Sequence, residues 1–367
     1  MCILARIIKT CMNLESKKPN SILKTSAIII GIIVMIFIVL EILARKKFDS
    51  FSYGSCPHEK LPGKLFFYIP LKNCKISIKH WESSKEIVYE TDENANRISS
   101  IPANFNSSMT AIAFFGDSFT WGAMNNVDEN YTHYTVATLK TMKDIDAGYN
   151  NFGVAGYNLL QVLERMRRND LKGYNYIVYG LTPNDLFSPQ TATLNEQQKQ
   201  ESTNIKKDSL IGIFKKKIYR HKLQSIKVAS KFLFDSFPKI YIYLYTLRDS
   251  NLAGYLSSSS SPYWNNRYSE LLGQLKNLNS DIKSRLIIQV IPQRVQVLLY
   301  AEGDLSNATA FEDRIEQICN ELDIKYNDSQ LPRLAGLENS HFTIDGHFTA
   351  SANVIIGRRL AEFISGL

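Results

Sequence analysis

The chain has 367 residues, of which 44% are hydrophobic and 21% charged, a balance that excludes a disordered chain and a polytopic membrane protein. It carries 43 Lys and Arg against 35 Asp and Glu, a formal net charge of +8, and only five Cys. So few cysteines exclude a disulfide-dense scaffold, and none forms a C-x-x-C pair of the kind that binds zinc. The length allows one large domain or two smaller ones.

An apolar run near the N-terminus predicts a membrane anchor. Residues 26–43 hold a single charged side chain, Glu41, and about twenty apolar residues cross a bilayer as a helix. We therefore expect a transmembrane anchor at 26–45, behind an N-terminal cytoplasmic segment at 1–25. A cleaved signal peptide and a buried core helix are the alternatives. Against cleavage, three basic residues at 45–47 stand where small residues would be expected.

The orientation of this anchor is not decided by charge, because five basic residues lie on each side of it within the flanking segments. We expect the N-terminus inside and the following domain exported, since a single N-terminal anchor usually serves that purpose. Cys56 and Cys74 could then form a disulfide in an oxidising compartment, although two free thiols fit the sequence equally well.

The segment 205–248 is strongly basic, with eleven Lys and Arg against two acidic residues. Its basic groups alternate with apolar and aromatic ones, which suits the surface of an anionic membrane. A solvated helical insertion is an equally good interpretation. The sequence contains no nucleic-acid reader motif, so we expect no nucleic-acid partner.

Apolar runs alternate with helix-like stretches from residue 110 onward, which predicts a parallel sheet covered by helices on both faces. The rhythm is interrupted at 186–280, which we interpret as an insertion. The expected strands are 110–115, 149–154, 174–179, 285–291 and 324–326, and the expected helices are 131–143, 159–169, 308–322 and 349–364.

Candidate catalytic residues follow these predicted strands. Gly-Asp-Ser, ending at Ser118, comes directly after the first strand, Gly156 follows the second, and Asn184 follows the third. Asp345 and His347 precede the last helix. Reactive groups of open α/β sheets gather beyond the carboxyl ends of the strands, so we expect these side chains to meet there.

Together these motifs resemble the SGNH (GDSL-type) hydrolase superfamily, in the form of a membrane-anchored member. The resemblance implies a three-layer flavodoxin-like α/β fold with a central parallel sheet at residues 106–367, after a linker and N-terminal extension at 46–105. It also implies a role for each motif residue. Ser118 would be the nucleophile, His347 the general base and Asp345 its orienting partner, with the Ser118 and Gly156 N–H groups and the Asn184 amide as the oxyanion hole.

Three features depart from the family pattern or compete with it. His347 stands two positions after Asp345, whereas in the family the His usually stands three positions after the Asp. Thr182 stands where Gly is usual in Gly-x-Asn-Asp, and His341 is a rival base.

From this resemblance we expect a serine hydrolase acting on an acyl ester, first an acetyl ester, of an envelope glycan or lipid. The alternatives are an O-acyltransferase on a polysaccharide, a lysophospholipase, and a non-catalytic glycan-binding module. No ligand spacing for a metal is present and we expect no cofactor.

Overall fold

The computed structural model describes residues 56–60, 67–80, 83, 85–103, 108–187, 262–342 and 346–367, together with Ile29, Gly31, Ile32 and Met35. Those four residues are helical, but no helix among the described residues is long and apolar enough to cross a membrane. The rest of the predicted anchor and the whole basic segment 205–248 lie outside the described residues, so both stay predictions. Every described residue beyond Met35 belongs to one compact unit.

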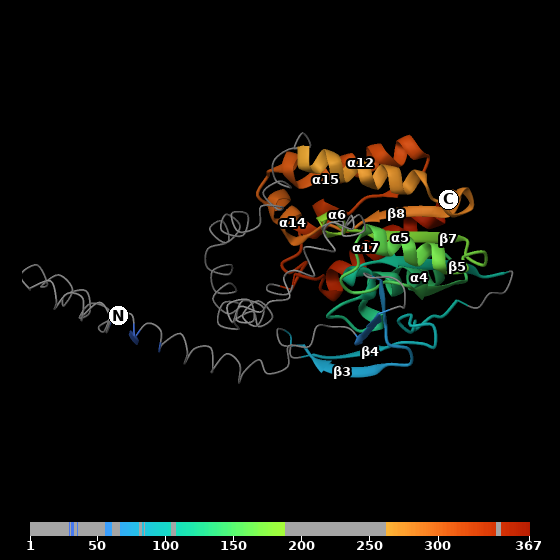
Figure 1. The fold of residues 1–367 in the computed structure, drawn as a ribbon, viewed down its shortest axis with the longest axis horizontal. Helices are drawn as coiled ribbons and strands as arrows, with labels where there is room; N and C mark the ends of the chain where they lie inside the picture. Colours follow the sequence, from blue (N-terminus) through green and yellow to red (C-terminus); the bar gives the residue numbers. More distant parts are fainter. Residues whose placement is uncertain are drawn as a thin grey trace, which may run out of the picture. The chain divides into compact units, whose positions relative to one another are not determined.

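A five-stranded parallel sheet forms the centre of this unit (Figure 1). Its strands are β5 (Thr110–Gly116), β6 (Ala147–Asn151), β7 (Tyr176–Leu181), β8 (Leu286–Val290) and β9 (Lys325–Asn327), in the order β6-β5-β7-β8-β9. Strands β5, β7 and β8 are almost continuously apolar because helices cover both of their faces. From β5 the chain passes first to one neighbour and later to the other, so β5 is a topological switch point.

Two helical layers enclose the sheet. Alternate residues of β5 point to opposite faces, Ile112 and Phe114 into one core cluster and Ala113 and Phe115 into another. The first cluster is closed by α4 (Tyr131–Met142), α16 (Leu331–Ala335) and α17 (Ala350–Ser365). The second is closed by α5 (Leu159–Arg168), α12 (Pro262–Lys276) and α15 (Leu305–Leu322). The three-layer α/β architecture is therefore as predicted.

Helix α12 differs from the sequence interpretation, which assigned its residues to the insertion at 186–280. Trp264, Tyr268, Leu271 and Leu275 are all buried in the second core cluster, at a spacing that places them on one helical face. Residues 262–280 are thus part of the core layer, and that spacing was visible in the sequence. The other helical elements of the compact unit, among the residues that the structure describes, are α3 (Ser118–Trp121), η1 (Val127–Glu129), α6 (Pro183–Phe187), α13 (Ser280–Arg285) and α14 (Arg294–Ala301).

The N-terminal extension contains two antiparallel strand pairs, which sequence analysis did not predict. They are β1 (His58–Lys60) with β2 (Tyr68–Pro70), and β3 (Lys75–Lys79) with β4 (Glu86–Glu90). Beyond them, residues 97–102 bridge to the edge strand β6 at Tyr149 and Asn151. This contact covers an edge that would otherwise present unpaired backbone groups.

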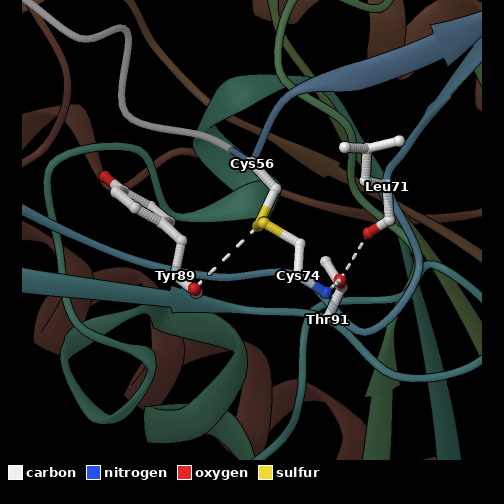
Figure 2. The surroundings of a disulfide bond; sticks show 5 residues. All are labelled: Cys56, Leu71, Cys74, Tyr89 and Thr91. Atoms are coloured by element: carbon white, nitrogen blue, oxygen red, sulfur yellow. Dashed lines mark hydrogen bonds between the residues drawn. A yellow bond between two sulfur atoms is a disulfide. The ribbon is translucent and has the colours of Figure 1, made fainter.

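A disulfide between Cys56 and Cys74 joins the two strand pairs (Figure 2). The Thr91 hydroxyl accepts a hydrogen bond from the Cys74 N–H at 2.9 Å and donates one to the Leu71 carbonyl at 2.6 Å, beside the disulfide. Cys56 is buried with Tyr89 of β4 in a third cluster that also contains residues of the loop after α3. The extension is therefore packed onto the α/β domain, and its two strand pairs are cross-linked to each other.

Candidate active site

Ser118 stands on a sharp turn between β5 and α3. Gly116 ends the strand with φ of +156°, and a Cβ at that position would lie 2.1 Å from Thr120 Oγ1, so the turn requires glycine. Asp117 then caps α3, its carboxylate accepting a hydrogen bond from the Phe119 N–H at 2.9 Å. The turn makes Ser118 the first residue of the helix, at the carboxyl edge of the sheet.

His347 lies against this serine. Its Nε2 is 2.7 Å from Ser118 Oγ, although the residues are 229 positions apart in the chain. The loop that carries it is closed by hydrogen bonds from the Phe342 N–H to the His347 carbonyl at 2.8 Å and from the Gly346 N–H to the Phe342 carbonyl at 3.0 Å. The Phe119 ring packs beside the imidazole, with 5.0 Å between ring centroids. Asp345 lies outside the described residues, so its orienting role stays a prediction.

His341, the rival base, is held elsewhere. Its Nδ1 lies 3.0 Å from the Ser340 hydroxyl and its Nε2 lies 3.3 Å from the Pro292 carbonyl oxygen. Burial lowers the pKa of His341 to about 3, which keeps the ring neutral. Both ring nitrogens are therefore used for packing this loop, and His341 is a structural residue.

Asn184 reaches the same turn from the end of β7. Its Nδ2 donates a hydrogen bond to Asp117 Oδ2 at 2.9 Å, and its Oδ1 accepts one from the Thr182 hydroxyl. That hydroxyl also lies 3.2 Å from Asp117 Oδ2. Burial raises the pKa of the Asp117 carboxyl, while these hydrogen bonds act against the rise. Thr182, which departs from the Gly-x-Asn-Asp pattern, therefore helps to fix the orientation of the Asn184 amide.

Asp185 supports the turn that presents Asn184. Its Oδ2 accepts hydrogen bonds from the Thr182 N–H and the Tyr179 hydroxyl, each at 3.1 Å. Burial and the nearby Asp117 raise the pKa of the Asp185 carboxyl well above its usual range, which favours the neutral form.

Gly156 lies on the loop after β6, which packs against the serine turn. The Val154 N–H donates to the Gly116 carbonyl at 3.1 Å, and a Cβ on Gly153 would lie 2.5 Å from the Trp121 nitrogen. Gly156 itself is exposed and has φ of +82°, a left-handed conformation that favours glycine. The structure thus brings the loop of Gly156 beside the serine turn.

Arg97, a residue that sequence analysis missed, holds the loop after α3. It is 2% exposed, and its guanidinium donates to the carbonyls of Trp121, Gly122 and Asn125, the last two at 2.7 Å. The Asn125 side chain in turn donates to the Phe348 carbonyl at 2.9 Å, next to His347. The extension is thus linked to the loop after α3 and to the loop that carries His347. No local pattern could have signalled this, because an isolated Arg has no periodicity.

Among the described residues, no group of three or more His, Cys, Asp or Glu side chains could hold a metal ion.

No protein-family model and no curated protein matches the chain. Several solved structures of esterases are similar to it. A member of the lipolytic protein G-D-S-L family from Veillonella parvula DSM 2008 is 12% identical, with 71% of this chain and 100% of that chain covered and a TM-score of 0.37. The lipase/acylhydrolase from Enterococcus faecalis is 11% identical, with 70% of this chain and 96% of that chain covered and a TM-score of 0.38. Axe2, an acetylxylan esterase from Geobacillus stearothermophilus, is 12% identical, with 70% of this chain and 94% of that chain covered and a TM-score of 0.36.

Proposed function

We propose that the chain is an SGNH-type serine hydrolase that cleaves an acyl ester through a covalent acyl-Ser118 intermediate. The observation that carries this proposal is the 2.7 Å separation of Ser118 Oγ and His347 Nε2 at the carboxyl edge of the sheet. A serine hydroxyl is a weak nucleophile unless a base accepts its proton, and this distance allows direct transfer.

The arrangement accounts for each step. His347 Nε2 takes the proton of Ser118 Oγ as the oxygen attacks the ester carbonyl carbon. The negative oxygen of the tetrahedral intermediate is stabilised by the N–H groups of Ser118 and Gly156 and by the Asn184 amide. His347 then returns its proton to the departing alcohol, leaving acyl-Ser118. Water, deprotonated by His347, attacks that acyl group and releases the acid.

We further propose an exported domain behind the predicted anchor, with an acetyl ester of an envelope glycan as the first substrate class. The Cys56–Cys74 disulfide supports export, because cytosolic proteins rarely retain structural disulfides. The same acyl-enzyme would serve an O-acyltransferase if a sugar hydroxyl replaced water, and a lysophospholipase if the acyl chain were long.

The test uses the full chain in membranes, with chromogenic acetyl, butyryl and octanoyl esters. Ser118→Ala and His347→Ala should each abolish turnover and labelling by a fluorophosphonate probe. Ser269→Ala and His133→Ala, at exposed or partly exposed positions on α12 and α4, are the matched controls. Turnover of wild-type rate in Ser118→Ala would refute the proposal. Labelling of Ser118 with turnover only when a polysaccharide acceptor is added would identify the transferase.

A further inference from the structure

The loop carrying Gly156 contains a tight turn whose central peptide decides where one oxyanion donor faces. The Tyr157 N–H donates to the Val154 carbonyl at 3.2 Å, which closes a β-turn over residues 154–157. Gly156, third in that turn, has φ of +82°, the value of a type II turn. Types I and II differ mainly by a flip of the central peptide, here the one between Ala155 and Gly156.

That peptide is planar, so the Ala155 carbonyl and the Gly156 N–H point in opposite directions. Any group that holds the carbonyl oxygen therefore also fixes the direction of the N–H. Glycine at position 156 tolerates either orientation, because it lacks the Cβ that would exclude one of them. The sequence of the turn alone therefore leaves room for a flip.

Tyr68, from strand β2 of the N-terminal extension, holds this carbonyl. Its hydroxyl donates to the Ala155 carbonyl at 3.1 Å, across 87 positions of the chain. A Cβ on Gly156 would lie 2.9 Å from the same hydroxyl, so Tyr68 stands directly against the turn.

Tyr68 is itself firmly placed. Its own carbonyl accepts a hydrogen bond from the Tyr157 hydroxyl, and its ring packs edge-on against the Tyr157 ring with 5.2 Å between centroids. On its other side the His58 ring stacks at 4.7 Å. Burial raises the pKa of Tyr68 to about 12, aided by the charge of Asp117, so the hydroxyl stays a donor at neutral pH.

We propose that Tyr68 is a positioning residue of the active site, whose hydroxyl locks the Ala155–Gly156 peptide so that the Gly156 N–H faces the oxyanion. This inference rests on the proposed function, since the N–H has this role only if Ser118 attacks a carbonyl. It assigns to the N-terminal extension a direct part in organising the oxyanion hole.

The first test is Tyr68→Phe in the full chain, which removes the hydroxyl and keeps the ring. Losing an oxyanion donor outright costs about 10²–10³-fold in kcat, and a misdirected donor should cost less, roughly 10–100-fold, with KM within about twofold of wild type. Tyr174→Phe is the matched control, because the Tyr174 hydroxyl accepts from Asn150 away from Ser118. Thermal unfolding of both variants verifies that they are folded.

A second readout separates alignment of the hole from general stability. A thionoester places sulfur where the oxyanion forms, and sulfur is the weaker hydrogen-bond acceptor. The preference is the ratio of kcat for the oxoester to kcat for the matched thionoester. In Tyr68→Phe this ratio should fall about as much as kcat for the oxoester falls, and in Tyr174→Phe it should equal the wild-type ratio.

Should Tyr68→Phe fail to fold, Gly156→Ala perturbs the same contact from the other side and should reduce the same preference. Wild-type kcat and an unchanged preference in a folded Tyr68→Phe would overturn the inference, while loss of turnover in Ser118→Ala would still uphold the hydrolase. Absence of both labelling and turnover in wild type, with and without a polysaccharide acceptor, would overturn both.

Discussion

Replacing Arg97 by Met should destabilise the domain and move Ser118 and His347 out of alignment. The ring centroids of Tyr89 and Trp121 lie 4.9 and 5.5 Å from Arg97 Cζ. Met keeps most of the volume of the aliphatic part of the arginine side chain beside these rings. It removes, however, the three guanidinium hydrogen bonds to the carbonyls of Trp121, Gly122 and Asn125.

The magnitude follows from these contacts. A hydrogen bond from a charged donor contributes about 1.5–3 kcal/mol, and three of them would sum to roughly 5–9 kcal/mol. Part of this is offset because the variant no longer has to bury a charge, so a net loss of about 4 kcal/mol is expected. For a domain of this size that loss lowers Tm by roughly 8–16 °C.

Activity should fall beyond what unfolding explains. Asn125, whose carbonyl Arg97 holds, also bonds to the Phe348 carbonyl next to His347, so a shifted loop moves base and nucleophile apart. A displacement of about 1 Å can cost 10²-fold in rate.

Urea unfolding and fluorophosphonate labelling at 10 °C would measure the two effects. Arg168→Met is the matched control, because Arg168 is exposed and forms an ion pair with Glu164 and a cation–π contact with the Phe67 ring. It should change the free energy of unfolding by about 0.5 kcal/mol at most. An Arg97→Met protein with the urea midpoint of Arg168→Met would refute the reasoning.

Three further predictions follow from other contacts. Asn184→Ala should lower kcat by about 10²-fold or more while changing KM little, as measured with the acetyl ester. Burial lowers the pKa of His341 from 6.5 to about 3 and raises that of Glu312 from 4.5 to about 7, so their effects on stability oppose each other between pH 4.5 and 6.5. As pH rises through that range, the free energy of unfolding of His341→Gln relative to wild type should fall by about 1.4 kcal/mol per pH unit, and that of Glu312→Gln should rise by as much. Urea unfolding measures both. Reducing the Cys56–Cys74 disulfide, which closes a loop of separation 18, should cost about 3 kcal/mol by thermal unfolding with and without a thiol reductant.

Each of these has a result that would contradict it. An unchanged kcat in Asn184→Ala would remove Asn184 from the oxyanion hole. Parallel pH profiles for the two Gln variants would mean that neither buried group titrates as its surroundings imply. An unfolding midpoint indifferent to reductant would mean that the extension is held by packing alone.

The layered architecture was predictable because its signals are local. The strands β5, β7 and β8 are short apolar runs, and the bounds of α4, α5 and α17 lie within about one residue of the predicted helices. Strand β6 lies about two residues earlier than predicted, since its first residues are Ala147 and Gly148 and carry little apolar signal. A Cβ on Gly148 would lie 2.6 Å from the Pro102 carbonyl oxygen, so contact with the extension selects a small residue there. A search for apolar strand patterns does not detect this constraint.

The same difference between local and long-range signals applies to the candidate site. Ser118, Gly156 and Asn184 could be named as candidates because each follows a predicted strand, and the carboxyl ends of parallel strands meet. Tyr68 and Arg97 were not predicted, because they contact the candidate site from an extension, and contacts that span tens of residues leave no periodic pattern in the sequence. A sequence pattern identifies groups that chemistry requires more readily than groups that hold them in place.

The distance in the chain between Ser118 and His347 has a consequence for biosynthesis. By the time residue 187 has been made, the chain already contains the proposed nucleophile and oxyanion donors, but the proposed base, His347, is still missing. His347 reaches Ser118 only when its loop is in place and α17 has docked against α4. Until then the serine keeps the low reactivity of an ordinary hydroxyl. Under the proposed function, a chain that is still emerging from the ribosome therefore cannot yet attack an ester.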